Sequence, residues 1–178
     1  VAENQCSDQG GGIYFTNNNY DSPLIINATI VRNSSNGYGG GFYYNNGVTE
    51  NSLLNTIIYF NTFTTSDPNS VNHSIGGSGF ESQDCLNCNV QYWNDDNNID
   101  TDPNFVDLYG GDYRLSDYSP VLGQGVLSDS LPVVDLDGNP RIQPVGTNPD
   151  LGCYENSLSE RIGSVKYYVS DDNGSDSS

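Results

Sequence analysis

Short runs of alternating apolar and polar residues, separated by clusters of Gly, Asn and Ser, fill the first half of the chain. The run Gly-Gly-Gly-Ile-Tyr-Phe-Thr at 10–16 returns as Gly-Gly-Gly-Phe-Tyr-Tyr-Asn at 39–45, and a degenerate copy, Gly-Ser-Gly-Phe, follows at 77–80. Alternation with a period of two predicts strands, and no window has the 3.6-residue period of a helix. Gly and Asn are also poor helix formers. The pattern therefore predicts an all-β chain.

A second motif, Asn-x-x-Ile-x-x-Asn, lies between copies of the first. It occupies 27–33 and, 28 residues later, 55–61. A third copy at 87–93 keeps the first Asn and a β-branched centre but ends on Trp93. Two unrelated motifs that advance together by one period near 28 residues are typical of the coils of a parallel β-solenoid. The alternative is a Gly- and Asn-rich β-sandwich with coincidental spacing.

The solenoid hypothesis makes specific demands on the side chains. Coils stack about 4.8 Å apart, so Ile30, Ile58 and Val90 should form a single interior column. The glycine triplets should occupy tight corners where a Cβ would crowd the next coil. An asparagine ladder should hydrogen-bond one coil to the next.

After Trp93 the period stops and four other motifs follow. They are Asn-Ile-Asp-Thr-Asp-Pro-Asn-Phe-Val-Asp at 98–107, Asp-Tyr-Arg-Leu-Ser-Asp-Tyr-Ser-Pro at 112–120, Asp-Leu-Asp-Gly-Asn-Pro-Arg at 135–141 and Pro-Asp-Leu-Gly-Cys-Tyr-Glu at 149–155. In this order they resemble the C-terminal region of secreted right-handed parallel β-helix proteins of the pectin-lyase-like superfamily, of the choice-of-anchor Q type. The GG-[I/F] and F-x-x-N elements resemble repeats of polymorphic outer-membrane proteins. The resemblance implies a right-handed parallel β-helix and an extracellular or cell-surface location.

We predict three parts: β-helix coils at 1–94, a C-terminal packing segment at 95–156, and a linker with the opening strand of a following unit at 157–178. The run Lys-Tyr-Tyr-Val-Ser near the C-terminus resembles the first strand of such a β-helix. We expect it to pair with the next unit as an added strand. This assembly strand comprises Lys166, Tyr167, Tyr168, Val169 and Ser170.

The composition and net charge of the chain exclude some classes of binding partner. The chain has 178 residues, 34% hydrophobic and 11% aromatic, with 5 Lys+Arg against 23 Asp+Glu and a net charge of -18. Such a chain repels phosphate backbones and anionic lipid surfaces, so we expect no nucleic-acid partner. No apolar run approaches the length of a membrane span. The chain opens without a signal peptide, which indicates a processed or excised start. Copies of itself, neighbouring β-helix units and glycans remain as expected partners.

The cysteines favour disulfides over a metal or redox site. One CxxC stands alone and His73 is the single histidine, which does not match zinc-site spacing. A redox CxxC is expected at a helix N-terminus, whereas this one lies in a strand-like stretch. An even number of cysteines in an extracellular context indicates a disulfide framework. We favour Cys85–Cys88 and Cys6–Cys153, and Cys6 alternatively pairs with a residue upstream.

Four Asn-x-Ser/Thr sequons are candidate N-glycosylation sites. They are Asn27, Asn33, Asn72 and Asn173. A Gly/Asn-rich chain also generates such triplets by chance.

A catalytic set is not evident. Pectate-lyase chemistry needs a basic residue and an acidic calcium cluster on one sheet, and Arg32 is the lone permanent cation of the coils. Asp95-Asp96 and His73 do not reproduce the polygalacturonase set. We expect Arg114 and Arg141 to pin the C-terminal segment to the solenoid through carboxylate pairs. The sequence therefore predicts no enzyme activity.

Two further groups of side chains have open interpretations. Asp135, Asp137 and Asn139 place oxygen donors around a glycine, which suits Ca²⁺, or simply form an Asp-Gly hairpin turn. No other cofactor is expected. The acidic stretches at 95–102 and 171–176 read as cation-gathering or solvated loops.

Aromatic rows on the coils are the second such group. Alternation points some of Tyr14, Tyr43, Tyr44 and Tyr59 outward, where they bind sugar rings or form stacking ladders. The leading functional hypothesis is a structural extracellular repeat unit that stacks or links end to end into a stiff stalk or filament. The alternatives are a carbohydrate-binding adhesin module and, third, a polysaccharide lyase or glycosidase relative.

Overall fold

The computed structural model of the chain describes residues 1–16, 23–45, 52–64, 74–77 and 84–161, and these form strands and turns without any α-helix. Within those residues there is accordingly no helix that could span a membrane. The assembly strand at 166–170 lies outside the described residues. The strands are β1 (Gln5–Cys6), β2 (Ile13–Thr16), β3 (Ile25–Ile26), β4 (Thr29–Val31), β5 (Ser34–Ser35), β6 (Phe42–Asn45), β7 (Leu53–Leu54), β8 (Ile57–Tyr59), β9 (Thr62–Phe63), β10 (Ile75–Gly77), β11 (Cys85–Leu86), β12 (Cys88–Val90), β13 (Asn98–Ile99), β14 (Phe105–Asp107) and β15 (Asp112–Leu115).

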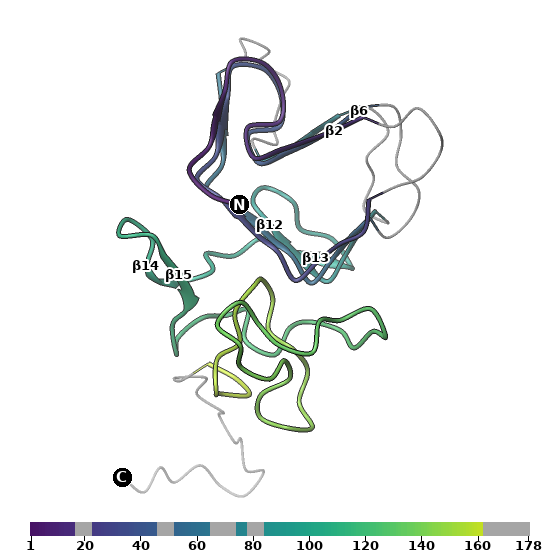
Figure 1. Cartoon of the computed structure of the whole chain (residues 1–178), viewed down its shortest axis with the longest axis vertical. Coiled ribbons are helices and arrows are strands. Elements are labelled where there is room, and N and C mark those ends of the chain that lie inside the picture. The colour runs from purple at the N-terminus through teal and green to yellow at the C-terminus, as the bar shows by residue number, and fades with distance from the viewer. Residues whose placement is uncertain (17–22, 46–51, 65–73, 78–83, 162–178) are drawn as a thin grey trace, which may run out of the picture.

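The strands stack into four parallel sheets that wind as successive coils (Figure 1). The sheet orders are β1-β5-β9, β2-β6-β10, β3-β7-β11 and β4-β8-β12-β13, so each strand pairs with the strand one coil away. In the view of Figure 1 the coils overlie one another almost perfectly. The predicted all-β parallel solenoid is confirmed, and the sandwich alternative is wrong.

The predicted interior column is present. Ile30 pairs with Ile58, and Ile58 with Val90, in adjacent strands of one sheet. All three side chains are fully buried and belong to the core that fills the solenoid. Full burial of a branched aliphatic side chain contributes about 1.5–3 kcal/mol, so this column is a large part of what holds successive coils together.

The third copy of the glycine motif has a different register from the predicted one. The sequence aligns Gly-Ser-Gly-Phe at 77–80 with the two glycine triplets, which would place Phe80 beside Phe42. Instead, β10 pairs Ile75 with Phe42 and Gly77 with Tyr44. Ile75 supplies the apolar interior residue five positions earlier, and interior burial decides the register of a strand. Phe80 lies outside the described residues.

The first asparagine of each Asn-x-x-Ile-x-x-Asn motif forms a corner. Asn27, Asn55 and Asn87 all have positive φ, between 47° and 50°. Asn tolerates this left-handed conformation better than most residues. The glycine corners obey a steric rule as well: a Cβ on Gly11 would overlap the carbonyl oxygens of Gly40 and Ser34 in the next coil.

The second asparagine forms the predicted ladder inside the solenoid. Asn33 Nδ2 donates to Asn61 Oδ1 at 3.0 Å, and Asn4 Nδ2 donates to Asn33 Oδ1 at 2.9 Å. Asn61 Nδ2 in turn donates to the Ile30 carbonyl at 2.8 Å. These amides satisfy buried backbone groups at the bend and so link three coils.

Residues after the solenoid pack against the outside of the β4-β8-β12-β13 sheet (Figure 1). This explains why β4 and β8 are buried on both faces: Ile30 belongs to the interior core, whereas Val31 and Ile57 belong to a second apolar cluster together with Val121 and Leu151 of the C-terminal segment. The parallel pairing continues past 94 into β13. An antiparallel hairpin, β14–β15, follows it.

Candidate functional site

The C-terminal segment, residues 100–161, binds the solenoid at the row of asparagine corners. Asn27 Nδ2 donates to the Asp150 carbonyl at 3.0 Å, and Asn87 Nδ2 donates to the Gln124 carbonyl at 3.3 Å. Asn55 between them exchanges two bonds with Val126, as donor at 2.9 Å and as acceptor at 2.9 Å. Each coil therefore has its own attachment to the segment, and these side chains are structural.

A buried charged cluster stabilises this segment from within. Arg141 and Glu155 form an ion pair of 2.8 Å, with side chains 3% and 0% exposed. Arg141 also donates to the carbonyls of Gly152 and Cys153. Beside it, burial raises the pKa of Asp150 to about 7, although its carboxylate accepts bonds from two backbone N–H groups.

Two other arginines also pair with carboxylates. Arg114 pairs with Asp112 of the same strand, and Arg32 pairs with Glu3 at 3.2 Å. Arg32 additionally donates to the Leu108 carbonyl, so it holds the β14–β15 turn against the first coil. The expectation that Arg114 and Arg141 pin the segment to the solenoid is corrected: their carboxylate partners lie within the C-terminal segment itself.

The candidate calcium residues form a hairpin turn. Asp135 Oδ1 accepts from the N–H groups of Asp137 and Asn139, and Oδ2 accepts from Asn139 Nδ2 and the Glu155 N–H. Burial works against these bonds, but together they hold the pKa of Asp135 below its usual value. The flanking Val134–Pro140 bridge is antiparallel. The oxygens are thus already occupied, which fits the turn interpretation.

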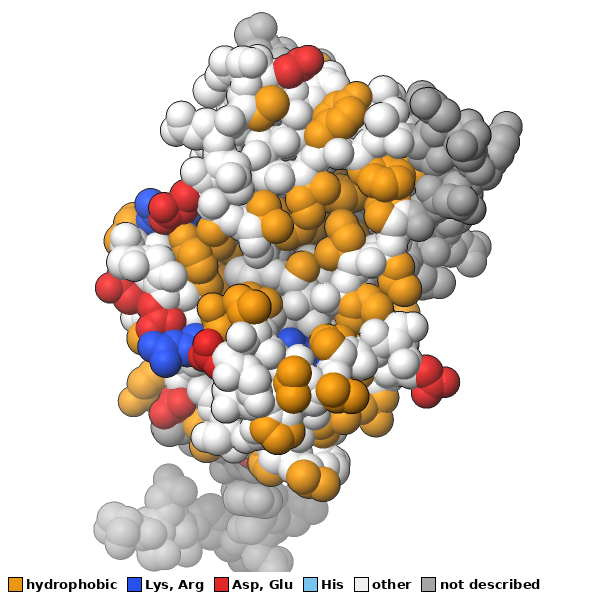
Figure 2. All heavy atoms as spheres, in the orientation of Figure 1, with side chains coloured by type: hydrophobic (Ala, Val, Ile, Leu, Met, Phe, Trp, Pro, Cys, Tyr) orange, Lys and Arg blue, Asp and Glu red, His pale blue; other side chains and the backbone are white. Residues whose placement is uncertain are grey.

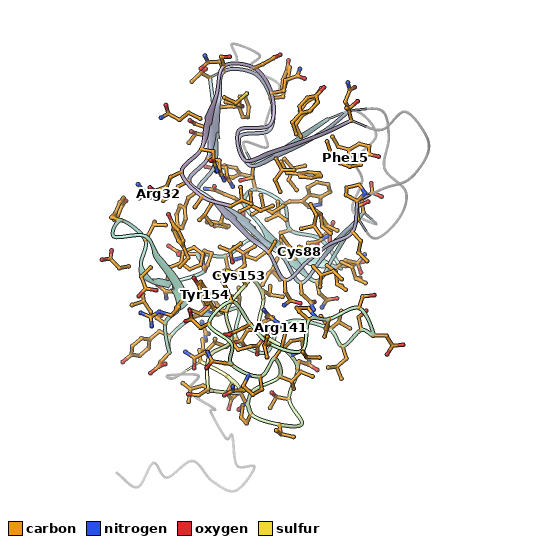
Figure 3. All side chains as sticks on the ribbon, in the orientation of Figure 1. Phe15, Arg32, Cys88, Arg141, Cys153 and Tyr154 are labelled. Atoms are coloured by element: carbon orange, nitrogen blue, oxygen red, sulfur yellow. The ribbon has the colours of Figure 1, made fainter. Side chains whose placement is uncertain are left out.

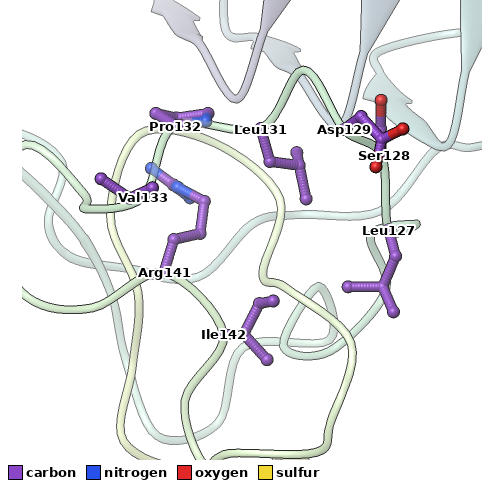
Figure 4. A pocket seen from close by; sticks show the side chains of 8 residues that line it. All are labelled: Leu127, Ser128, Asp129, Leu131, Pro132, Val133, Arg141 and Ile142. Atoms are coloured by element: carbon purple, nitrogen blue, oxygen red, sulfur yellow. The ribbon is translucent and has the colours of Figure 1, made fainter.

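No group of three or more His, Cys, Asp or Glu side chains is arranged for a metal ion within the described parts of the chain. His73 lies outside those parts. One surface hollow there has a volume of about 470 Å³, and Figure 4 shows its mainly apolar lining. Arg141 is the one cation that lines this hollow, and its guanidinium is engaged by Glu155 and two carbonyls.

The predicted disulfides are not present in the structure, in which all four cysteines are free thiols. Cys85 and Cys88 are buried in the solenoid core, where burial and a hydrogen bond between the two thiols raise the pKa of Cys85. Cys6 lies in β1, whereas the Cys153 N–H bonds Thr29 of a different sheet. Figure 3 shows Cys88 on the solenoid and Cys153 in the C-terminal segment.

Two predicted glycosylation residues are interior. Asn27 and Asn33 are only 4% and 1% exposed, and both side-chain amides donate hydrogen bonds. A glycan on either nitrogen would break the corner contact or the inner ladder, so these sequons are not surface acceptors in this fold. Asn72 and Asn173 lie outside the described residues.

The tyrosine rows separate into different environments. Tyr14 and Tyr43 stack outward in adjacent coils, with ring centroids 5.5 Å apart and planes 9° apart. Tyr44 is fully buried and stacks under Phe15. Tyr59 lies beneath the C-terminal segment, where its hydroxyl donates to Asp100. Since the outward pair stack on each other, each ring has one face covered, which favours the ladder interpretation.

The first coil leaves apolar interior side chains uncovered. Ile13, Phe15 and Ile25 are only half-buried, although they pack on the core. Their partners one coil away, Phe42, Tyr44 and Leu53, are each 0% exposed. Figure 2 shows hydrophobic side chains gathered between the β2–β6 and β12–β13 strands of Figure 1, and Figure 3 labels Phe15 there. We call this surface, formed by β1, β2 and β3, the open end.

The interior of the solenoid is covered at the opposite end, although β9, β10 and β11 are the outer strands of their sheets there. Trp93 packs against the core where the second asparagine of the motif would stand, and its Nε1 donates to Asp95 at 2.7 Å. Asp95 also accepts bonds from the Asn97 and Asn98 N–H groups. The turn then returns as β13, which covers β12. The two ends of the solenoid are therefore chemically different.

Comparison with known proteins adds no relative. No protein-family model, no curated protein and no solved structure matches the chain. The coarse fold is thus established by the strand pairing alone, and the finer family resemblance stays a prediction.

Sequence reasoning missed a second row of left-handed corners. Glu3, Arg32, Phe60 and Tyr92 all have positive φ, between 55° and 66°. Their side chains share no chemistry, so only their position could have revealed them: the last three each lie two residues after the interior residue of a strand, which is Ile30, Ile58 or Val90. This row matters because it places Arg32 and Glu3 where they bind the β14–β15 hairpin.

Proposed function

We propose that this chain is a structural solenoid unit that assembles end to end through its open end. The observation that carries the proposal is the contrast between half-buried Phe15 and its fully buried stacking partner Tyr44. An uncovered strand edge with apolar side chains beside it is a template for another strand. A further coil on the open end would complete the burial that the later coils already have.

The resemblance of the C-terminal motifs to secreted β-helix proteins supports an extracellular or cell-surface setting for this assembly. An assembled solenoid resists bending because ladders such as Asn33–Asn61 and Tyr14–Tyr43 continue along its axis. The proposed product is therefore a stiff stalk or filament. Glycan binding by the tyrosine row and polysaccharide cleavage remain predictions, because no arrangement of the described residues favours either.

The proposal is tested by the size of the full-length chain in solution and by electron microscopy. We expect reversible association that increases with concentration, and elongated particles on grids. Association should also strengthen as salt is raised, because two copies of net charge -18 repel each other and salt screens that repulsion. A chain that stays monomeric at every concentration and salt level would contradict the proposal.

A further inference from the structure

The open end has a strand edge with a defined hydrogen-bonding pattern. The Ile13 N–H donates at 2.9 Å to the carbonyl of Gly41, the residue before β6, so the N–H and C=O groups of Ile13 point toward the second coil. Backbone groups of successive strand residues point to opposite sides. Those of Tyr14 and Thr16 therefore point out of the open end, where no described strand pairs with β2.

The side chains of β2 and β6 follow one rule. In both strands an interior apolar residue is followed by an outward Tyr, an interior aromatic residue and an outward small polar residue. These are Ile-Tyr-Phe-Thr at 13–16 and Phe-Tyr-Tyr-Asn at 42–45. The run Tyr-Tyr-Val-Ser at 167–170 follows the same alternation, with Val169 in place of the interior aromatic residue. Its alignment puts Tyr168 in the row of Tyr14 and Tyr43, and Val169 over Phe15.

We propose that residues 167–170 of a second copy add to the open end as a parallel strand beside β2. This inference rests on the proposed end-to-end assembly and names the partner of that site. In this register Tyr168 stacks on the open face of the Tyr14 ring, and Val169 covers the half-buried Phe15. The Val169 N–H donates to the Tyr14 carbonyl, and the Thr16 N–H donates to the Val169 carbonyl.

Two features assign the strand to a second copy rather than to other sources. At the opposite end Trp93 and β13 cover the interior, so the open end of a neighbour would meet no uncovered apolar core there. Tyr167 is six Cα–Cα steps from Arg161, which span at most about 21 Å. Figure 1 shows the described chain ending on the far side of the β3 and β4 sheets and the C-terminal segment from β2.

The test compares full-length chains by sedimentation velocity over a concentration series. Val169→Asp, which places a charge at the interior position, should weaken association at least tenfold. Ser170→Asp is the matched control, because it adds the same charge on the outward face and should change association less than twofold. On the accepting edge, Thr16→Pro removes the donated N–H and should also weaken association at least tenfold, whereas Thr16→Val retains the N–H and association.

Synthetic peptides of residues 164–173 check the register. The unmodified peptide should inhibit assembly of the full-length chain, and so should the peptide N-methylated at Tyr168, whose N–H points away from β2. The peptide N-methylated at Val169 should not inhibit, because that N–H donates to Tyr14. Equal potency of the two methylated peptides would overturn the proposed register.

The outcomes separate the inference from the proposed function. Loss of association in both Thr16→Pro and Val169→Asp supports the inference. Loss in Thr16→Pro alone overturns the assignment of 167–170 but leaves assembly through the open end intact. A wild-type chain that never associates overturns both. Far-UV circular dichroism and fluorescence of the single Trp, Trp93, establish that each variant remains folded.

Discussion

Replacing Asn61 with Asp tests whether the inner asparagine ladder holds the coils together. The substitution keeps the shape of the side chain but turns Nδ2 into an oxygen. Nδ2 donates to the carbonyls of Ile30 at 2.8 Å and Tyr59 at 3.1 Å, and each lost bond costs about 0.5–1.5 kcal/mol. The geometric loss is therefore about 1–3 kcal/mol of unfolding free energy.

Ionisation adds a second, pH-dependent cost. Asn61 is 2% exposed, so a carboxyl there should have a raised pKa, and each pKa unit corresponds to about 1.4 kcal/mol. A raised folded-state pKa means that the penalty is absent below the unfolded-state pKa and grows as pH rises through the folded-state pKa. For a rise of about two units, the total cost near pH 7 is about 4–6 kcal/mol.

Urea denaturation at pH 4.5 and pH 7.5, followed by circular dichroism and Trp93 fluorescence, measures this cost against the wild type at each pH. The control is Asn36→Asp, an exposed position whose Oδ1 accepts from Thr64 and is retained. We expect the control to stay within about 0.5 kcal/mol of the wild type. If Asn61→Asp matched the control at both pH values, the ladder would contribute nothing measurable and our account of coil cohesion would be refuted.

Three further predictions concern the corners and the C-terminal segment. Gly11→Ala should lower the unfolding free energy by more than about 2 kcal/mol, because the new Cβ would overlap the backbone of the next coil. The control is Gly146→Ala, whose Cβ would meet only open space and which should cost about 1 kcal/mol because of its positive φ. Thermal or urea denaturation measures both. Arg141→Met should cost about 3–5 kcal/mol of unfolding free energy, because it leaves the buried Glu155 carboxylate without its ion pair. Arg114→Met removes an ion pair at the surface and should cost under about 1 kcal/mol. Limited proteolysis should cut the C-terminal segment faster in Arg141→Met but not in Arg114→Met. Because burial raises the pKa of Asp150 from its usual value near 4 to about 7, its contribution to stability is present at low pH and is lost as pH rises through that interval. Asp150→Asn should therefore flatten the stability profile between about pH 4 and pH 7, and an unchanged slope would contradict this.

The solenoid could be predicted because each repeat contains the residues that determine its own strands and turns. The 28-residue spacing of Asn27 and Asn55 predicts the stacked column of Ile30 and Ile58, since each coil must place equivalent residues at equivalent positions. That the two asparagines themselves form left-handed corners is shown by the structure. Where the repeat degenerates, the prediction fails. Gly-Ser-Gly-Phe was aligned by its letters, but the strand register follows the buried apolar residue, which is Ile75.

The contacts between the solenoid and the C-terminal segment were not predictable in the same way. The pairing of Asn55 with Val126 joins residues 71 positions apart and leaves no periodic trace in the sequence. The sequons at Asn27 and Asn33 also depend on contacts that are distant in the sequence. A three-residue motif identifies an acceptor chemically, but whether its amide is exposed depends on the next coil and on the packing segment.

The row of corner contacts has a mechanical consequence. The C-terminal segment accepts hydrogen bonds from Asn27, Asn55 and Asn87, one residue from each successive coil, so it connects the three coils to one another. A pulling force that separates one coil from the next would act on the hydrogen bonds to the C-terminal segment and on the hydrogen bonds between strands at the same time. Rupture under tension should therefore occur in one step, and not as a gradual unwinding turn by turn.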